Sequence, residues 1–222
     1  MSAVFVAGAH TDVGKTHVAC ALLRAARAAG RSVAALKPVV SGFDPADWAG
    51  SDPGRLLTAL GRPLTQAALD AISPWRFTAP LAPPMAARRE GRTLGLAEIA
   101  AFCCDRKEGV DLALIEGVGG LMSPIADDAT GLELMTALGL PVVLVGGSYL
   151  GAISHVLTAL ETATGRGLAV RAVVVSESPD RDAPDFAETI ADVRRYAGGV
   201  AVIGAPRDGG SDDWARAVLP LL

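Results

Sequence analysis

"VFVAGAHTDVGKTHVACALL" (residues 4–23) joins an apolar run to a helical pattern through the small and polar sequence GAHTDVGKT. A strand, a glycine-containing turn and a helix in this order are the setting of a phosphate-binding loop. Glycine lets the backbone approach an anion closely, and the free amides of a helix N-terminus favour negative charge. We therefore predict that Lys15 bridges the β- and γ-phosphates of a nucleotide and that the Thr16 hydroxyl coordinates Mg²⁺.

The spacing of the two glycines departs from the usual pattern G-x(4)-G-K-[ST], because five residues separate Gly8 from Gly14. A GKT sequence that follows a turn by chance is the alternative. The preceding apolar run and the following helical pattern favour the phosphate-binding loop over that alternative.

The bulk composition limits the class of protein. The chain has 222 residues, 50% hydrophobic and 20% charged, which is typical of one α/β domain over residues 1–222. A formal net charge of −4 provides no basic face, so we expect no nucleic-acid partner. With no signal peptide and no run long enough for a membrane span, we expect a cytoplasmic protein without a membrane partner. Three cysteines without ligand spacing, Cys20, Cys103 and Cys104, suit packing in a reducing compartment.

Short runs rich in Val, Leu and Ile alternate with helical patterns along the chain. Continuous apolar runs are typical of parallel strands buried on both faces, and their alternation with helices predicts right-handed βαβ units. The predicted fold is α/β and P-loop NTPase-like, with a mostly parallel central sheet and helices on both faces. The proline-rich segment 42–84 is expected to carry loops. The predicted strands are 4–7, 33–36, 112–115, 142–145, 170–175 and 200–203, and the predicted helices are 16–29, 52–60, 96–107, 131–138, 152–163, 185–197 and 212–219.

A second motif supports the nucleotide site. The sequence DLALIEGVGG places Glu116 at the carboxyl end of a predicted strand, before a glycine-rich turn. Ligands of open α/β sheets bind at the carboxyl ends of the strands, where a carboxylate can hold magnesium directly or through water. The alternative is a solvated residue at a strand end, and the phosphate-binding loop favours the functional role.

Five segments together resemble the dethiobiotin synthetases, ATP-dependent ligases of biotin synthesis. They occur in that family's order and at similar intervals, and the resemblance covers the chain to about residue 180. The segments are GAHTDVGKT (8–16), ALKPVVSG (35–42), SD (51–52), LIEGVGGLMSP (114–124) and LVGGSYLGAISH (144–155).

The resemblance implies a homodimer, with the substrate site at the interface, that closes the ureido ring of dethiobiotin. Its substrates would be 7,8-diaminononanoate (7,8-diaminopelargonate), CO₂ and ATP with Mg²⁺. One amine would take up CO₂ as a carbamate, the carbamate would attack the γ-phosphate, and the second amine would close the ring and expel phosphate. Such an anionic assembly requires cations in a site that excludes water.

The family resemblance also implies roles for individual residues. Lys37 would steady the carbamate and act with Lys15 in catalysis, although a lysine at a strand end is otherwise more often solvated. Thr16, Asp52 and Glu116 would form the magnesium shell, although Ser51 or Asp52 also fits a helix N-cap. The substrate would contact Thr11 and Ser41, and also Leu150, Gly151 and Ser154, which the other subunit would supply. The nucleotide would contact Asp12, Val13, Gly14, Lys15, Thr16, His17, Asp52, Glu116, Gly117, Val118, Gly119, Ser176, Glu177, Pro206 and Arg207.

Several positions depart from the family pattern. His10 stands where an aspartate is common, and Ser154 stands in place of an asparagine. Ser176 and Glu177 stand where many members carry an asparagine that contacts the adenine edge. A serine offers one rotating hydroxyl in place of an amide's donor and acceptor, so we expect weaker discrimination between nucleobases. We expect His17 and His155 to be structural or simply polar, because no nucleophile pattern accompanies them.

Two alternatives to the ligase remain. The same scaffold serves partitioning-type ATPases and the synthetase domain of cobyrinate amidotransferases. The first typically has an additional lysine early in the loop, where this chain has Ala9 and His10, and the second requires a glutaminase domain. The other alternative is a nucleotide-binding regulatory module with little catalysis, suggested by the departures at His10, Ser154 and Ser176.

Overall fold

Six parallel strands form the central sheet of the computed structural model, which describes residues 2–106, 109–207 and 212–222. The six predicted apolar runs are its strands, and the valines and leucines of the middle strands are buried, as expected for a sheet covered on both faces. The spatial order is β10-β9-β8-β1-β5-β2. The bounds are β1 (Ser2–Gly8), β2 (Val33–Leu36), β5 (Leu112–Glu116), β8 (Val142–Gly146), β9 (Val170–Ser176) and β10 (Ala201–Ala205).

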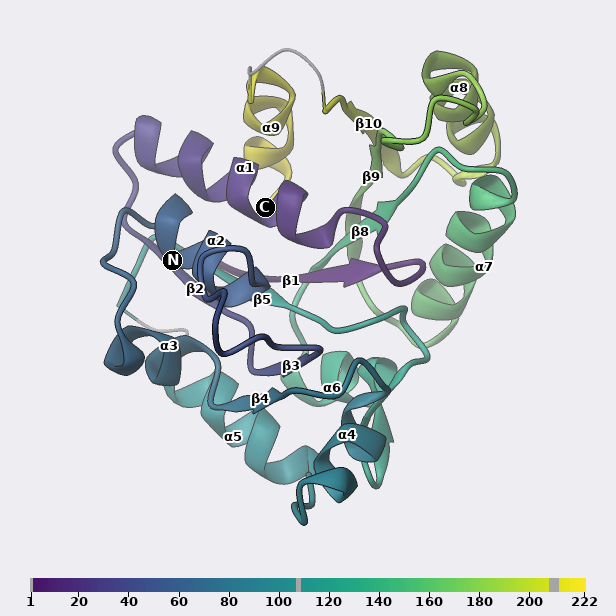
Figure 1. The fold of residues 1–222 in the computed structure, drawn as a ribbon. Helices are drawn as coiled ribbons and strands as arrows, with labels where there is room; N and C mark the ends of the chain where they lie inside the picture. Colours follow the sequence, from purple (N-terminus) through teal and green to yellow (C-terminus); the bar gives the residue numbers. More distant parts are fainter. Residues whose placement is uncertain (1, 107–108, 208–211) are drawn as a thin grey trace.

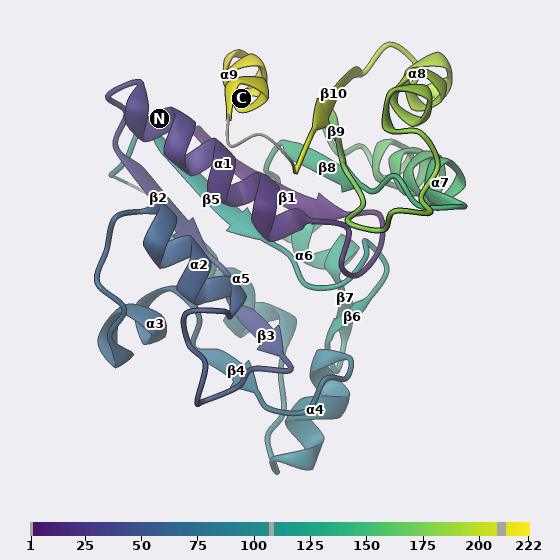
Figure 2. The ribbon, with the colours of Figure 1, turned by 45° about the horizontal axis from the view of Figure 1, so that its top comes forward.

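Helices cover both faces of the sheet (Figures 1 and 2). On one face, α1 (Lys15–Ala28) packs against α9 (Asp213–Val218) and α2 (Asp52–Ala59). The opposite face carries α5 (Leu96–Arg106), α6 (Gly131–Leu138), α7 (Ala152–Gly165) and α8 (Phe186–Tyr196). These seven helices confirm the predicted ones, except that residue 107 lies outside the described residues. Among the described helices, none is both long and apolar enough to cross a membrane.

The expectation of loops over residues 42–84 is wrong in part. Besides the predicted α2, this segment contains α3 (Gln66–Ile72), capped by the Thr65 hydroxyl, and β4 (Trp75–Phe77), which pairs in parallel with β3 (Val39–Ser41). The elements are short, so their periodicity is weak in the sequence. The short helix α4 (Pro83–Arg89), the hairpin of β6 (Pro124–Ala126) and β7 (Ala129–Thr130), and a terminal 3₁₀ turn (Leu219–Leu221) complete the described elements.

The parallel direction of the strands gathers the predicted site at one edge of the sheet. Gly8, Glu116 and Ser176 are the last residues of β1, β5 and β9, and Lys37 directly follows β2. Arg207 lies just beyond the end of β10. Because the carboxyl ends of all these strands meet at this edge, residues far apart along the chain can contribute to a single site.

Candidate active site

Two glycines shape the predicted phosphate-binding loop between β1 and α1. Gly14 is the N-cap of α1 and has a φ of 91°, in the left-handed region that favours glycine. A Cβ on Gly14 would lie only 2.4 Å from the Ser176 Oγ. A Cβ on Gly8 would lie 2.8 Å from the His10 carbonyl oxygen and 2.9 Å from the Lys15 Cδ. The loop therefore requires glycine at both positions, although their spacing departs from the usual pattern.

Lys15 is a buried cation with little compensation. Its side chain is 7% exposed at the start of α1, and its Nζ donates to the His10 carbonyl oxygen at 3.3 Å. Burial, followed by repulsion from the Lys37 ammonium, lowers the pKa of Lys15 to about 8. An ammonium held in this way gains by binding an anion, as the predicted contact with nucleotide phosphates requires.

A network of four side chains lies beside the loop. The Thr16 Oγ1 is 2.8 Å from Asp52 Oδ1 and 2.7 Å from Glu116 Oε1. The Lys37 Nζ is 2.6 Å from Glu116 Oε1 and 3.0 Å from Asp52 Oδ2. The Ser51 hydroxyl caps α2, accepting the Gly54 N–H, so Asp52 can lie in the first turn and still reach the network. The structure thus brings together the three predicted magnesium ligands and Lys37, one of the two lysines predicted to act in catalysis.

The charges of this network stabilise one another. Burial alone would lower the pKa of the Lys37 ammonium, but the carboxylates of Glu116 and Asp52 raise it above its ordinary value. Burial would likewise raise the pKa of Asp52, but the charge of Lys37 and hydrogen bonds from Lys37 and Thr16 lower it. Both groups are therefore ionised at neutral pH.

The donor set fits a magnesium ion. Glu116 Oε2 is buried and has no hydrogen-bond partner, which leaves a carboxylate oxygen available to a cation. No cluster of three His, Cys, Asp or Glu side chains suited to a metal occurs in the described part of the chain. Mg²⁺ does not need one, because it binds through one or two carboxylates and completes its shell with water and substrate phosphates. Thr16, Asp52 and Glu116 meet that requirement.

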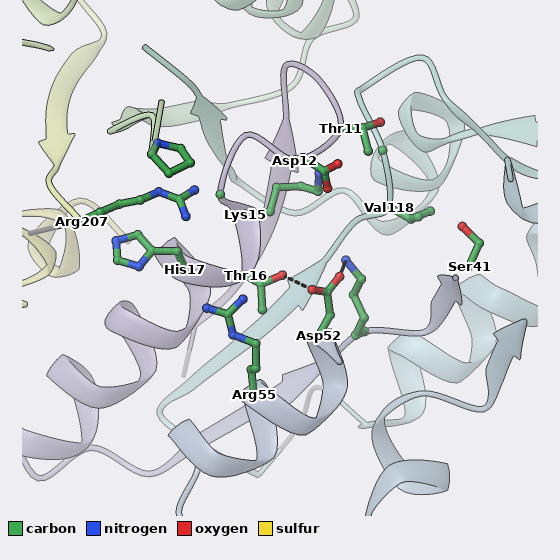
Figure 3. A pocket seen from close by; sticks show the side chains of 14 residues that line it. Thr11, Asp12, Lys15, Thr16, His17, Ser41, Asp52, Arg55, Val118 and Arg207 are labelled. Carbon is green, nitrogen blue, oxygen red and sulfur yellow. Dashed lines mark hydrogen bonds and ion pairs between the residues drawn. The ribbon is translucent and has the colours of Figure 1, made fainter. Parts of the chain in front are cut away.

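A cavity of about 410 Å³ connects the loop to this network (Figure 3). Asp12 lines it with a φ of 56°, a left-handed conformation that few non-glycine residues adopt. Twelve predicted residues line it: Thr11, Asp12, Gly14, Lys15, Thr16, His17, Lys37, Ser41, Asp52, Val118, Gly119 and Arg207.

A second cavity, of about 550 Å³, adjoins the first and has more apolar walls. Thr11 and Ser41 line both cavities, so they stand at the junction between the phosphate loop and the second space. Pro80, Leu81 and Pro83 form an apolar part of the wall. A ligand with a polar head and an aliphatic chain fits this pair of cavities.

The far end of the first cavity is formed by His17, Pro179 and Arg207. Arg207 is anchored by Glu177, whose carboxylate accepts the Arg207 backbone N–H at 2.9 Å and whose carbonyl accepts Arg207 Nε at 2.7 Å. In Figure 3 the Arg207 guanidinium points toward His17 and the loop. Burial, followed by the charges of Arg207 and Arg24, lowers the pKa of His17.

Other predicted residues do not line this cavity. Val13 packs in the hydrophobic core, and Gly117 contributes a carbonyl oxygen that accepts a hydrogen bond from Lys37 at 2.8 Å. Ser176 is 1% exposed, and its hydroxyl is buried against Gly14 without a hydrogen-bond partner. Further residues outside the cavity lining are Glu116 and Pro206 and, at the start of α7, Leu150, Gly151 and Ser154.

Sequence reasoning missed some residues of the site. Arg55 lines the first cavity from α2, and its position three residues after Asp52 places both on one face of that helix. Near the loop, the His10 ring stacks on His155 with centroids 5.3 Å apart, and the Tyr149 hydroxyl is 2.8 Å from His155 Nδ1. No sequence signal links His10 to His155, because only the fold brings β1 and α7 together.

The sheet order, the loop at the end of β1 and the lysines Lys15 and Lys37 beside it define a P-loop nucleotide-binding protein of the α/β class. A family model described as an AAA domain matches residues 2–205. The MinC:MinD cell division protein complex of Aquifex aeolicus contains a similar fold, with a TM-score of 0.55 over 98% of this chain and 86% of that chain. The sequences are only 9% identical, so this likeness concerns the fold alone.

Curated relatives define the family more narrowly. The ATP-dependent dethiobiotin synthetase BioD of Phenylobacterium zucineum is 60% identical over 100% of this chain and 95% of its own length. The protein of the same name from Caulobacter vibrioides is 56% identical over 96% of this chain and 95% of its own length. This chain belongs to the dethiobiotin synthetase family, as the five sequence segments indicated.

Proposed function

We propose that this chain is an ATP-dependent dethiobiotin synthetase that joins 7,8-diaminononanoate and CO₂ into the ureido ring of dethiobiotin. The names of the curated relatives support this activity. The structural observation that carries it is the shared lining of two cavities: the phosphate loop opens into the same space as Lys37 and Ser41, which adjoins a more apolar cavity. That arrangement suits a nucleotide on one side and an aliphatic diamine on the other.

The proposed reaction has three steps. One amine attacks CO₂, forms a C–N bond and loses a proton, which gives a carbamate. A carbamate oxygen then attacks the γ-phosphorus of ATP, and the bond from that phosphorus to ADP breaks. Finally the second amine attacks the carbamate carbon, the bond from that carbon to the phosphorylated oxygen breaks, and phosphate leaves with ring closure.

The cationic side chains of the cavity have distinct roles in this proposal. Lys15 binds the β- and γ-phosphates at the N-terminus of α1, where the backbone amides also favour anions. Lys37 binds the carbamate and stabilises the charge that develops on its oxygens. Thr11 and Ser41 position the diamine at the junction of the cavities. Thr16, Asp52 and Glu116 would hold magnesium, which neutralises phosphate charge when bound.

The nucleotide extends from Lys15 toward the end of the cavity formed by His17 and Arg207. Glu177 orients Arg207 through two hydrogen bonds, so it acts on the nucleotide through that arginine. Pro206 lies beside Arg207 at the end of β10, within reach of the same region. The remaining predicted contacts, made by Asp12, Val13, Gly14, Gly117, Val118 and Gly119, come from the two turns that surround the phosphates.

We also propose a homodimer in which the start of α7 completes the partner's substrate site. Leu150 is 90% exposed, which is unusual for a large apolar side chain, and Gly151 is the N-cap of α7. The Ala152 N–H donates to the Tyr149 carbonyl oxygen, and the amides that follow it in the first turn, with the Ser154 side chain, suit the substrate carboxylate. A cytoplasmic location is part of the proposal, since the cysteines are thiols rather than disulfides.

Incubation with 7,8-diaminononanoate, bicarbonate and MgATP tests the proposed function. We expect dethiobiotin by mass spectrometry and ADP formation that depends on the diamine. Lys37→Ala should reduce product formation by about 100-fold or more while nucleotide still binds, because the carbamate loses its cation. Full activity of Lys37→Ala would contradict the role of Lys37. Nucleotide binding without diamine-dependent turnover would favour a regulatory module instead.

A further inference from the structure

The hydrogen-bonding capacity of Lys37 is fully used within the network. Its ammonium has three N–H groups and three acceptors: Glu116 Oε1 at 2.6 Å, the Gly117 carbonyl oxygen at 2.8 Å and Asp52 Oδ2 at 3.0 Å. Lys37 is 2% exposed and Glu116 is 1% exposed, so these contacts are shielded from solvent. In this arrangement no N–H of Lys37 remains for a substrate.

The two carboxylates, by contrast, have more acceptor positions than donors. The Thr16 hydroxyl has one hydrogen, yet carboxylate oxygens of Glu116 and Asp52 lie 2.7 and 2.8 Å from its oxygen. Glu116 Oε2 is buried without any partner. Lys37 is the ammonium in direct contact with both carboxylates, and Lys15 acts on them only through space.

These contacts place Lys37 on the same two carboxylates that would hold a magnesium ion. Glu116 Oε1 lies within hydrogen-bond distance of both Lys37 and Thr16. On the Asp52 carboxylate, Oδ1 contacts Thr16 and Oδ2 contacts Lys37. Two cations on these carboxylates would repel each other strongly in a buried site. Lys37 cannot keep all three of its contacts and also bind the carbamate.

We infer that Lys37 is the resident counter-cation of the metal site and competes with the divalent ion for Glu116 and Asp52. This inference rests on the proposed magnesium site and adds a second role for Lys37. The negative charge of the nucleotide phosphates makes room for a second cation, so the ion binds well only together with nucleotide. Lys37 then leaves the carboxylates and turns its ammonium toward Ser41, where the carbamate forms. Metal loading and exposure of Lys37 to the substrate are thereby one coupled event.

Lys15 provides a matched control for charge. It lines the same cavity and is similarly buried, but the hydrogen bond of its ammonium is to the His10 carbonyl oxygen at 3.3 Å. Removing the charge of Lys15 reduces the repulsion of a metal ion through space. Removing the charge of Lys37 also releases the two carboxylates, so its effect on metal binding should be larger.

Binding of Mn²⁺ to the nucleotide-free protein, followed by the loss of the free-ion EPR signal, measures this competition without activity. We expect Lys37→Met to bind Mn²⁺ about tenfold or more tightly than the wild type, which is within the usual range of coupling between sites. Lys15→Met should increase the affinity by a smaller factor. Circular dichroism confirms that each variant is folded. Equal affinities for Lys37→Met and Lys15→Met, or no gain for Lys37→Met, would overturn the inference.

A second measurement uses the wild-type chain and does not depend on a stable variant. NMR of ¹⁵N-labelled lysine ammonium groups should show a slowly exchanging Lys37 signal, because that group is buried and hydrogen-bonded. The signal should shift or disappear with Mg²⁺ and a non-hydrolysable ATP analogue, but not with Mg²⁺ alone. The same change with Mg²⁺ alone would overturn the inference. Calorimetry of analogue binding separates this result from a failure of the proposed nucleotide site, and the inference can fail while dethiobiotin is still formed.

Discussion

Gly14 and Ser176 are in direct contact, although Gly14 follows β1 and Ser176 ends β9. A Cβ on Gly14 would lie 2.4 Å from the Ser176 Oγ. Through this contact the end of β9 packs against the phosphate-binding loop. The two elements are held together here by close packing and not by a hydrogen bond, since the Ser176 hydroxyl has no partner.

Gly14→Ala should therefore abolish nucleotide binding. The substitution adds a Cβ at a φ of 91° and against Ser176, so both backbone strain and steric overlap displace the loop. Gly30→Ala is the control, since Gly30 has a φ of 77° but no atom within 4 Å of the added Cβ. Isothermal titration calorimetry with a non-hydrolysable ATP analogue provides the measurement. Normal affinity in Gly14→Ala would show that the loop does not hold the phosphates.

The position of Ser176 also predicts weak discrimination between nucleobases. Its hydroxyl lies against Gly14 and Ser176 does not line the cavity, so it is poorly placed to contact a base edge. We expect kcat/KM values for ATP, CTP and GTP within about tenfold of one another, because Ser176 offers no fixed donor and acceptor pair to a base edge. A strong preference for ATP alone would contradict this expectation.

The lowered pKa of Lys15 predicts that nucleotide affinity depends on pH. Its pKa is lowered to about 8, so the ammonium that attracts phosphate is present below that pH and is lost as the pH rises through it. Bound phosphate stabilises the protonated form, so binding above pH 8 takes up a proton and affinity falls by up to about tenfold per pH unit. Calorimetry in buffers of different ionisation enthalpy measures the proton uptake. Lys15→Met should bind weakly and show no such uptake; an unchanged uptake in this variant would assign the proton to another group.

The exposure of Leu150 indicates a substitution that should disrupt the proposed dimer. Because its side chain is 90% exposed in the single chain, Leu150→Asp should cost about 0.5 kcal/mol or less in monomer stability and yet weaken the dimer. Tyr196, at the end of α8 and 62% exposed, is the control, and Tyr196→Asp should leave the dimer intact. Light scattering after size exclusion gives the molar masses. A dimeric Leu150→Asp protein, or a monomeric wild type, would show that this surface is not the interface.

The sequence predicted the sheet well because its strands carry unmistakable apolar runs. Val142–Gly146 is buried along its whole length, and its continuous apolar pattern is typical of a strand covered on both faces. The helix capped by Thr65 and the pairing of β3 with β4 were missed, since seven- and three-residue elements hardly display a period. Packing of α3 against α2, and of β3 and β4 against each other and α4, helps to fix that region.

Site residues could be predicted from the sequence where their position at the end of a strand places them at the carboxyl edge of the sheet. Glu116 ends a buried strand, and Lys37 follows another, so both were expected at the carboxyl edge. Their 2.6 Å contact, and the way Asp52 joins them, depend on the position of α2 and on distances that no sequence spacing encodes. The orientation of Ser176 toward Gly14 likewise follows from the packing of β9 under the loop.

Transfer of oxygen from labelled bicarbonate tests the central claim most directly. The wild-type protein is incubated with MgATP, 7,8-diaminononanoate and bicarbonate labelled with ¹³C and ¹⁸O. We predict dethiobiotin that contains one ¹³C atom and released phosphate that contains one ¹⁸O atom, because the carbamate oxygen that attacks the γ-phosphorus leaves with it. Unlabelled phosphate, or ADP formed without labelled dethiobiotin, would contradict the proposed carbamate phosphorylation in this site.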